Sequence, residues 1–160
     1  MKHILFLDMD GVLVDLPQTK VKVPIGEKRE WEDPLFWECL PKTSFADELV
    51  RVCSTFYHVQ ILSTLCTPGS GMGKLLWLRQ NYPAIADNVI LTTNAKYLLA
   101  APGRVLVDDD PSNCLEFELH GGFAVEVPNP KINLDSRKVT MEMIYNRIRG
   151  LHNFQGLNTC

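Results

Sequence analysis

The sequence predicts an α/β domain in which a mostly parallel sheet of five strands lies between two layers of helices. Short apolar runs recur along the chain, and they are rich in β-branched residues or leucine, as strands covered on both faces are. Helical patterns separate these runs, which is typical of crossovers between parallel strands. Together these observations predict a three-layer, Rossmann-like α/β/α domain with strands at 4–7, 59–62, 89–91, 105–107 and 123–127.

Helical periodicity predicts four helices, at 44–56, 73–81, 112–119 and 136–149. Ser44 stands at the expected N-cap of the first helix, and the second is expected to end before Pro83. The glycines before the second helix lack the lysine–serine/threonine ending of a phosphate loop. A flexible loop is therefore expected at Gly69, Gly71 and Gly73.

The length of 160 residues predicts one domain, over residues 1–150, followed by a C-terminal tail at 151–160. Residues 14–41 are rich in proline and charge and too long for an ordinary connection, so they are interpreted as a small cap or lid inserted after the first strand. Three aromatic side chains in this cap have faces that can stack on a nucleobase; they are Trp31, Phe36 and Trp37. A surface excursion whose aromatics only pack it onto the core is the alternative.

Composition excludes several classes of function. A net charge of −3 argues against a general nucleic-acid-binding surface. The five cysteines include no C-x-x-C pair, so free thiols in a reducing cytosol, and hence a cytoplasmic protein, are expected. The N-terminal apolar run is too short to span a membrane and ends in acidic residues.

Two aspartates follow the first apolar run directly. Asp8 and Asp10 stand at the carboxyl end of this run, and open α/β sheets bind their ligands at that edge. Carboxylates this close repel each other unless a cation lies between them, so the pair predicts a divalent metal site. Gly11 allows the tight turn that brings backbone amides and the Asp10 carbonyl toward the ion.

Polar residues also follow three later strands: Ser63 and Thr64, then Lys96, then Asp108 and Asp109. Because the carboxyl ends of parallel strands meet at one edge, these side chains are expected to share a pocket with the first pair. The set suits phosphoryl transfer. One carboxylate attacks phosphorus, Mg²⁺ neutralises the anions, and the hydroxyl and ammonium groups stabilise the phosphate oxygens. A second carboxyl group acts as acid and then as base.

The order and spacing of DMDGV at 8–12, LST at 62–64, Lys96 and VDD at 107–109 resemble the four motifs of the haloacid dehalogenase-like hydrolases. Within that superfamily the chain is most similar to the 5′(3′)-deoxyribonucleotidases. The resemblance implies a Mg²⁺-dependent phosphomonoesterase that forms an aspartyl-phosphate and hydrolyses nucleoside 5′- or 3′-monophosphates. The stretches that carry the closer similarity are 8–15, 40–41, 77–82, 90–96 and 105–109.

The resemblance also implies roles for single residues. Asp8 would be the nucleophile and a metal ligand, and Asp10 the general acid and base with its backbone carbonyl on the metal. Asp109 would bind the metal directly, and Asp108 would act through water or an orienting hydrogen bond. Lys96 would hold both the phosphate and the nucleophile. The residues expected to bind the substrate or its phosphate are Gly11, Trp31, Phe36, Trp37, Ser63, Thr64 and Lys96.

Other functions stay open. The cap is shorter than the cap of the resembled family, so sugar phosphates or polynucleotide ends are alternative substrates. A receiver-like signalling module uses the same residue types, but its acidic pair precedes the phosphorylated aspartate, whereas the D-x-D pair comes first here. A phospholigand-binding protein without turnover is a further alternative.

Overall fold

The computed structural model of the chain describes residues 2–16, 29–128 and 140–157. Five strands form one sheet in the order β3-β2-β1-β4-β5, and all neighbouring strands are parallel. Each strand coincides with a predicted one, so the expected α/β class is confirmed. The strands are β1 (Ile4–Leu7), β2 (His58–Thr64), β3 (Val89–Thr92), β4 (Val105–Asp108) and β5 (Phe123–Glu126).

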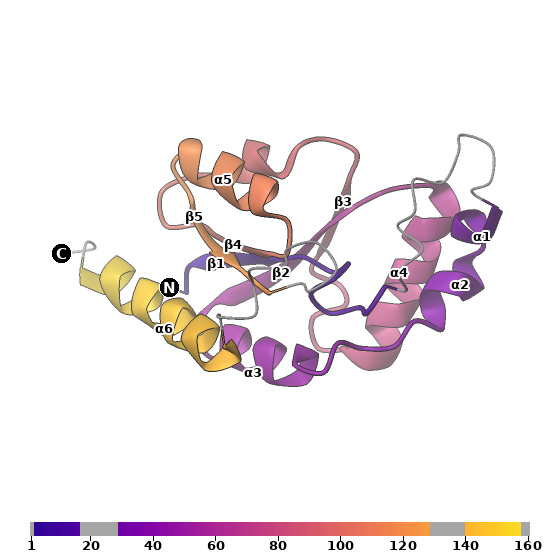
Figure 1. Cartoon of the computed structure of the whole chain (residues 1–160), viewed down its shortest axis with the longest axis horizontal. Helices are drawn as coiled ribbons and strands as arrows, with labels where there is room; N and C mark the ends of the chain where they lie inside the picture. Colours follow the sequence, from indigo (N-terminus) through magenta and orange to yellow (C-terminus); the bar gives the residue numbers. More distant parts are fainter. Residues whose placement is uncertain (1, 17–28, 129–139, 158–160) are drawn as a thin grey trace.

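Helices cover both faces of the sheet (Figure 1). Leu5 and Leu7 of β1 point into the larger core, which the helices α3, α4 and α6 cover. Phe6 points to the opposite face and packs with Phe117 of α5 in a second core. The helical elements are α1 (Arg29–Glu32), α2 (Pro34–Glu38), α3 (Ala46–Phe56), α4 (Pro68–Asn81), the 3₁₀ helix η1 (Lys96–Leu99), α5 (Pro111–Leu119) and α6 (Met141–Leu157).

The strand order reverses between β1 and β4, and this point positions the site. In open α/β sheets a crevice forms outside the carboxyl ends of the strands where the order reverses. Here the Asp8 amide donates to the Val107 carbonyl at 2.9 Å, which holds the ends of the two strands together. The order also differs from the 2-1-3-4-5 order of flavodoxin-like and receiver domains, so the structure argues against the receiver alternative.

The glycine-rich stretch before Lys74 is helical, so the expected flexible loop is wrong. Helix α4 begins at Pro68, and Thr67 is its N-cap. The Thr67 hydroxyl accepts from the Ser70 amide at 3.0 Å, and the Ser70 hydroxyl accepts from the Thr67 amide at 2.9 Å. This capping box and a proline in the first turn together stabilise a helix start despite the glycines.

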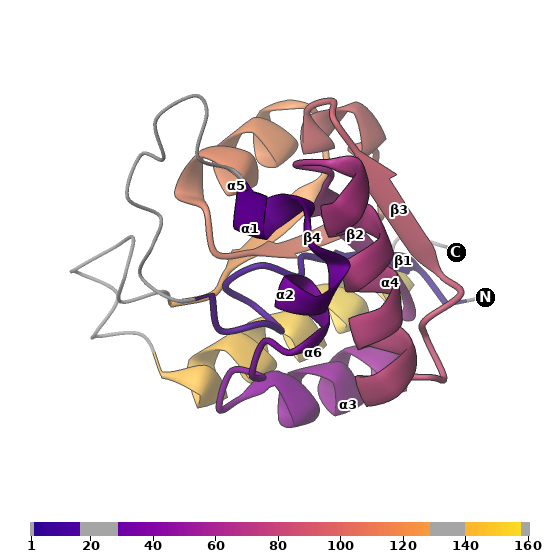
Figure 2. The same ribbon diagram turned by 90° about the vertical axis from the view of Figure 1, so that its right-hand side faces the viewer.

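Two of these glycines have a packing reason. A Cβ atom on Gly69 would collide with the Glu32 carbonyl, and one on Gly73 would collide with the Pro34 carbonyl and the Trp37 side chain. The glycines therefore let α1 and α2 lie directly against α4 (Figure 2). This tertiary packing outweighs the low helix propensity of glycine.

Two further expectations about helix ends are wrong. Phe45 is the N-cap of α3 and makes no side-chain cap bond, so Ser44 does not cap this helix. Residues 151–157 belong to α6 rather than to a tail, and the expected helix start at 136 lies outside the described residues. Helix α6 is held by core contacts of Ile144 and by the Tyr57 hydroxyl, which donates to the Ile148 carbonyl at 3.0 Å.

Candidate active site

A tight turn follows β1 and directs its two aspartates apart. The amides of Leu13 and Val14 both donate to the Met9 carbonyl at 2.9 Å. Gly11 has a φ of 83°, a conformation that favours glycine, as the sequence predicts. The buried turn thus fixes the backbone on which the neighbouring carboxylates stand. Asp8 lies against the end of β4, whereas Asp10 faces α4.

Three buried carboxylates gather where β1 and β4 end. Asp8, Asp108 and Asp109 each have an oxygen within 4.8 Å of the others. Carboxylate oxygens are the ligands that Mg²⁺ and Ca²⁺ prefer, so this donor set fits a hard divalent cation. The Asp10 carboxylate does not belong to this cluster.

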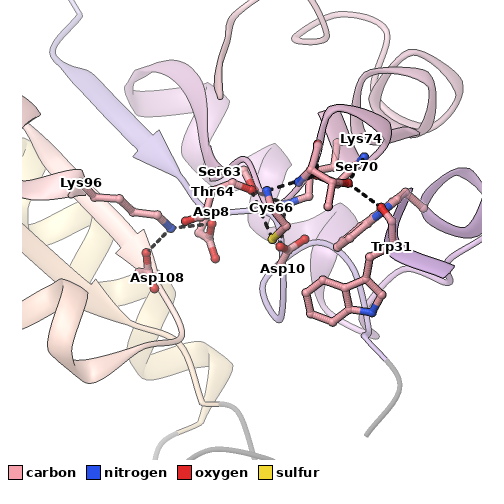
Figure 3. A network of polar contacts seen from close by, with 12 residues as sticks. Asp8, Asp10, Trp31, Ser63, Thr64, Cys66, Ser70, Lys74, Lys96 and Asp108 are labelled. Atoms are coloured by element: carbon pink, nitrogen blue, oxygen red, sulfur yellow. Dashed lines mark hydrogen bonds and ion pairs between the residues drawn. The ribbon is translucent and has the colours of Figure 1, made fainter. Parts of the chain in front are cut away.

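Lys96 lies between two of these carboxylates (Figure 3). Its ammonium donates to Asp8 Oδ1 and to Asp108 Oδ2, each at 2.6 Å. Burial alone would lower the pKa of Lys96, but the negative charges of Asp8 and Asp108 outweigh it, and the pKa is raised. Lys96 is therefore a fixed cation beside Asp8, supplied by the first residue of η1.

Asp108 is held from several sides. The Asp110 amide donates to Asp108 Oδ1 at 2.9 Å, and the Asn113 side-chain amide donates to the same oxygen at 3.2 Å. Burial raises the pKa of Asp108 to about 7, with a further contribution from Asp8 and against the effect of Lys96. Without a cation the cluster thus resists full ionisation, and a bound cation would relieve this cost.

Asp10 has a lysine of its own. The Lys74 ammonium, fully buried in α4, donates to Asp10 Oδ2 at 2.7 Å. Burial raises the pKa of Asp10 although the charge of Lys74 acts in the opposite direction. A raised pKa favours the protonated carboxyl group, which a general acid requires.

The residues after β2 divide between the cavity and the core. Thr64 is exposed and lines the cavity. Ser63 is fully buried, does not line the cavity, and its hydroxyl accepts from Lys74 at 3.0 Å.

A cavity of about 280 Å³ lies over these groups, and its wall contains Asp8, Asp10, Lys96 and the acidic residues after β4. Trp31 and Trp37 also line it, as Leu16 does. Trp37 is almost wholly buried, and its indole N–H donates to the Trp31 carbonyl at 2.9 Å. Phe36 packs on Trp37 with ring centroids 5.5 Å apart but does not line the cavity.

Lys74 and Asn113 are the residues that sequence reasoning missed. Thr67 followed by Pro68 is a helix-start signal that would have extended the predicted helix, which already contained Lys74, back to Pro68. It does not reveal that Lys74 meets Asp10. Asp110 caps α5, which places Asn113 in the first turn of that helix and within reach of the acidic cluster.

No family model matches the sequence, and no curated protein matches it. Among solved structures, the HAD family enzyme BT-2542 from Bacteroides thetaiotaomicron in its magnesium complex is similar, with a TM-score of 0.53 and 14% identity over 80% of this chain and 94% of that one. An aspartate-to-alanine mutant of that enzyme, in complex with magnesium and inorganic phosphate, has a TM-score of 0.49 and 15% identity over 81% of this chain and 95% of that one.

The similarity to the magnesium complex shows that this chain has the fold of a HAD family enzyme. Within the described residues, no helix combines the length and the apolar character needed to cross a bilayer.

Proposed function

We propose that this protein is a Mg²⁺-dependent phosphatase that hydrolyses phosphate monoesters through an aspartyl-phosphate on Asp8. One observation carries the proposal: Asp8 stands in a buried cluster of three carboxylates, contacts the Lys96 ammonium at 2.6 Å and lines a cavity. The similar fold of BT-2542, an enzyme solved with magnesium, supports the choice of metal.

Asp8, Asp109 and Asp108 would hold the Mg²⁺ ion, together with the backbone carbonyl of Asp10. Asp109 is proposed as a direct ligand and Asp108 as the residue close behind it. When bound, the ion neutralises charge on the attacking carboxylate and on the phosphate.

The residues of the chain supply the rest of the reaction. A carboxylate oxygen of Asp8 bonds to phosphorus while the bond from phosphorus to the substrate alcohol breaks. Asp10 gives its proton to the departing alkoxide. Asp10 then takes a proton from a water molecule, whose oxygen bonds to phosphorus as the bond to Asp8 breaks and phosphate leaves. The Lys96 ammonium, with Thr64 and the Gly11 turn, is proposed to stabilise the phosphate oxygens. Ser63, expected from the sequence to bind phosphate, lies behind the cavity wall with its hydroxyl on Lys74, so no phosphate contact is proposed for it.

A nucleoside 5′- or 3′-monophosphate, in ribo or deoxyribo form, is the substrate that we propose. The cavity of about 280 Å³ lies just below the range of about 300–1,000 Å³ that is usual for ligand sites, which favours a small substrate. Tryptophan side chains form part of its wall. Aromatic faces bind bases by stacking. Residues 14–41, of which 17–28 lie outside the described part of the chain, are proposed to form the cap over this substrate. Trp31 and Trp37 would lie toward the base and Phe36 behind them.

Phosphate release from nucleoside monophosphates, sugar phosphates and 5′- and 3′-phosphorylated oligonucleotides tests this proposal. We expect release with Mg²⁺, its loss with EDTA, and a loss of at least about 10³-fold in Asp8→Asn because the nucleophile is removed. Asp87→Asn is the matched control, since Asp87 is exposed and does not line the cavity.

Wild-type rates in Asp8→Asn would contradict covalent catalysis. Turnover of nucleotides no faster than that of sugar phosphates or oligonucleotide ends would contradict the proposed substrate alone.

A further inference from the structure

We propose that Lys74 is a positioning residue for Asp10, which it anchors through one carboxylate oxygen so that the other exchanges a proton with the leaving group. This inference rests on the proposed phosphatase function and adds a residue of α4 that lies outside the four sequence motifs.

The contacts of Lys74 exclude a direct role in phosphate binding. Its ammonium donates to Asp10 Oδ2 at 2.7 Å, to Ser63 Oγ at 3.0 Å and to the Thr64 carbonyl at 2.8 Å. These three acceptors match the three N–H groups of an ammonium. The side chain is fully buried, and the Trp37 ring covers it, with the Nζ atom 4.7 Å from the ring centroid. Lys74 therefore acts on the substrate only through the groups that it contacts, and Asp10 is the one carboxyl group among them.

The two oxygens of Asp10 have different surroundings. Oδ2 accepts from Lys74, whereas Oδ1 is buried and has no hydrogen-bond partner among the described residues. Buried polar atoms without partners are rare, so such an atom calls for an explanation. Asp10 lines the cavity, and a substrate oxygen placed there would give Oδ1 its partner. Oδ2 of Asp10 is thus held by Lys74, whereas Oδ1 is left to meet the substrate.

The fold holds both partners in place. Asp10 stands on the hydrogen-bonded turn after β1, and Lys74 stands next to Gly73, where α4 is in close contact with Pro34 and Trp37 of α2. In Figure 3 Lys74 and Lys96 lie on opposite sides of the carboxylates. Displacement of a catalytic group by 1 Å costs about 10²-fold in rate, so loss of the Lys74 anchor is expected to impair proton transfer.

A purely structural role for Lys74 predicts a different kinetic result. Proton donation matters little for p-nitrophenolate, which leaves readily as an anion, and matters strongly for an alkoxide. In a variant with a misplaced Asp10, kcat/KM falls mainly for alkyl phosphates. In a generally damaged enzyme, kcat/KM falls equally for both esters.

The test compares kcat/KM for p-nitrophenyl phosphate with kcat/KM for glycerol phosphate. The parameter kcat/KM reports the steps up to transfer of the phosphoryl group. For Lys74→Met we expect a loss under about tenfold with the aryl ester and of about 10²-fold with the alkyl ester. Asp10→Asn should show the same selectivity, and adding Lys74→Met to it should cause no further loss.

Lys42→Met is the matched control. Lys42 also donates to an aspartate at 2.7 Å and lies 5.3 Å from a tyrosine ring centroid, but it is exposed and does not line the cavity. This variant should retain wild-type kcat/KM on both esters.

A crystal structure of Lys74→Met gives a readout that does not depend on turnover, since the Asp10 carboxyl group should leave its wild-type orientation. Equal losses on both esters, additive losses in the double variant or an unchanged Asp10 orientation would overturn the assignment. If Lys74→Met does not fold, Lys74→Gln is judged by the same three criteria. A wild-type protein that releases phosphate from no ester would contradict the proposed function instead.

Discussion

Asp8 and Asp10 are one residue apart, yet each meets a lysine of a different helical element and a different charge balance. In the cluster of Asp8, Asp108 and Asp109, the Lys96 ammonium contacts two of the three carboxylates. Beside α4, the Asp10 carboxylate meets the ammonium of Lys74, whose other two acceptors are neutral. The first group is rich in carboxylates, whereas Asp10 and Lys74 balance each other, so the first group is the better candidate to hold the proposed cation.

Removal of Lys96 should have the largest effect on stability. Breaking a buried ion pair by deleting one partner costs about 3–5 kcal/mol, and Lys96→Met leaves both Asp8 and Asp108 without their ammonium. We expect this loss in the free energy of unfolding when urea denaturation is measured in EDTA, with part of it restored by Mg²⁺.

Lys42→Met, which removes an exposed ion pair, should cost less than about 1 kcal/mol in the same assay. Equal effects of the two substitutions would show that burial does not distinguish the lysines.

The pH dependence of stability tests the charge balance of the cluster of Asp8, Asp108 and Asp109. The pKa of Asp108 is raised to about 7 in the folded protein, so between pH 4 and 7 the folded chain retains a proton that the unfolded chain has lost. Stability of the metal-free protein should therefore fall as pH rises through this window. Thermal unfolding in EDTA measures this fall, which Mg²⁺ should reduce because it favours the ionised carboxylates.

Asp108→Asn should flatten this pH dependence in part, since Asp10, whose pKa is also raised, contributes with the same sign. A wild-type midpoint that rises between pH 4 and 7 would contradict the charge balance described for the cluster.

Gly73→Ala tests the packing of α2 on α4 and should have a smaller effect than Lys96→Met. The added methyl group collides with the Pro34 carbonyl and with Trp37, and such overpacking costs about 1–3 kcal/mol. Gly150→Ala in α6 meets no atom within 4 Å and should stabilise by about 0.5–1 kcal/mol. Chemical denaturation compares the two variants, and a neutral Gly73→Ala would contradict close packing of α2 on α4.

The sheet was predictable because each of its strands is a short apolar run, and the acidic residues were predictable because they follow such runs directly. The start of α4 was not recovered because three glycines disfavour a helix locally, whereas contacts with residues more than thirty positions earlier in the sequence stabilise it. For the same reason the pairing of Lys74 with Asp10, which lie 64 residues apart, could not be read from spacing. Sequence patterns report local preferences and strand ends, but not which helix face meets which turn.

The central position of β1 in the sheet affects how the site is lost when the protein unfolds. Outer strands open most readily in local fluctuations, whereas a middle strand opens only with the whole domain. Because Asp8 follows β1 and Asp108 ends β4, its inner neighbour, fraying of β3 or β5 leaves their spacing untouched. The carboxylates of Asp8 and Asp108 are therefore expected to stay together until the whole domain unfolds.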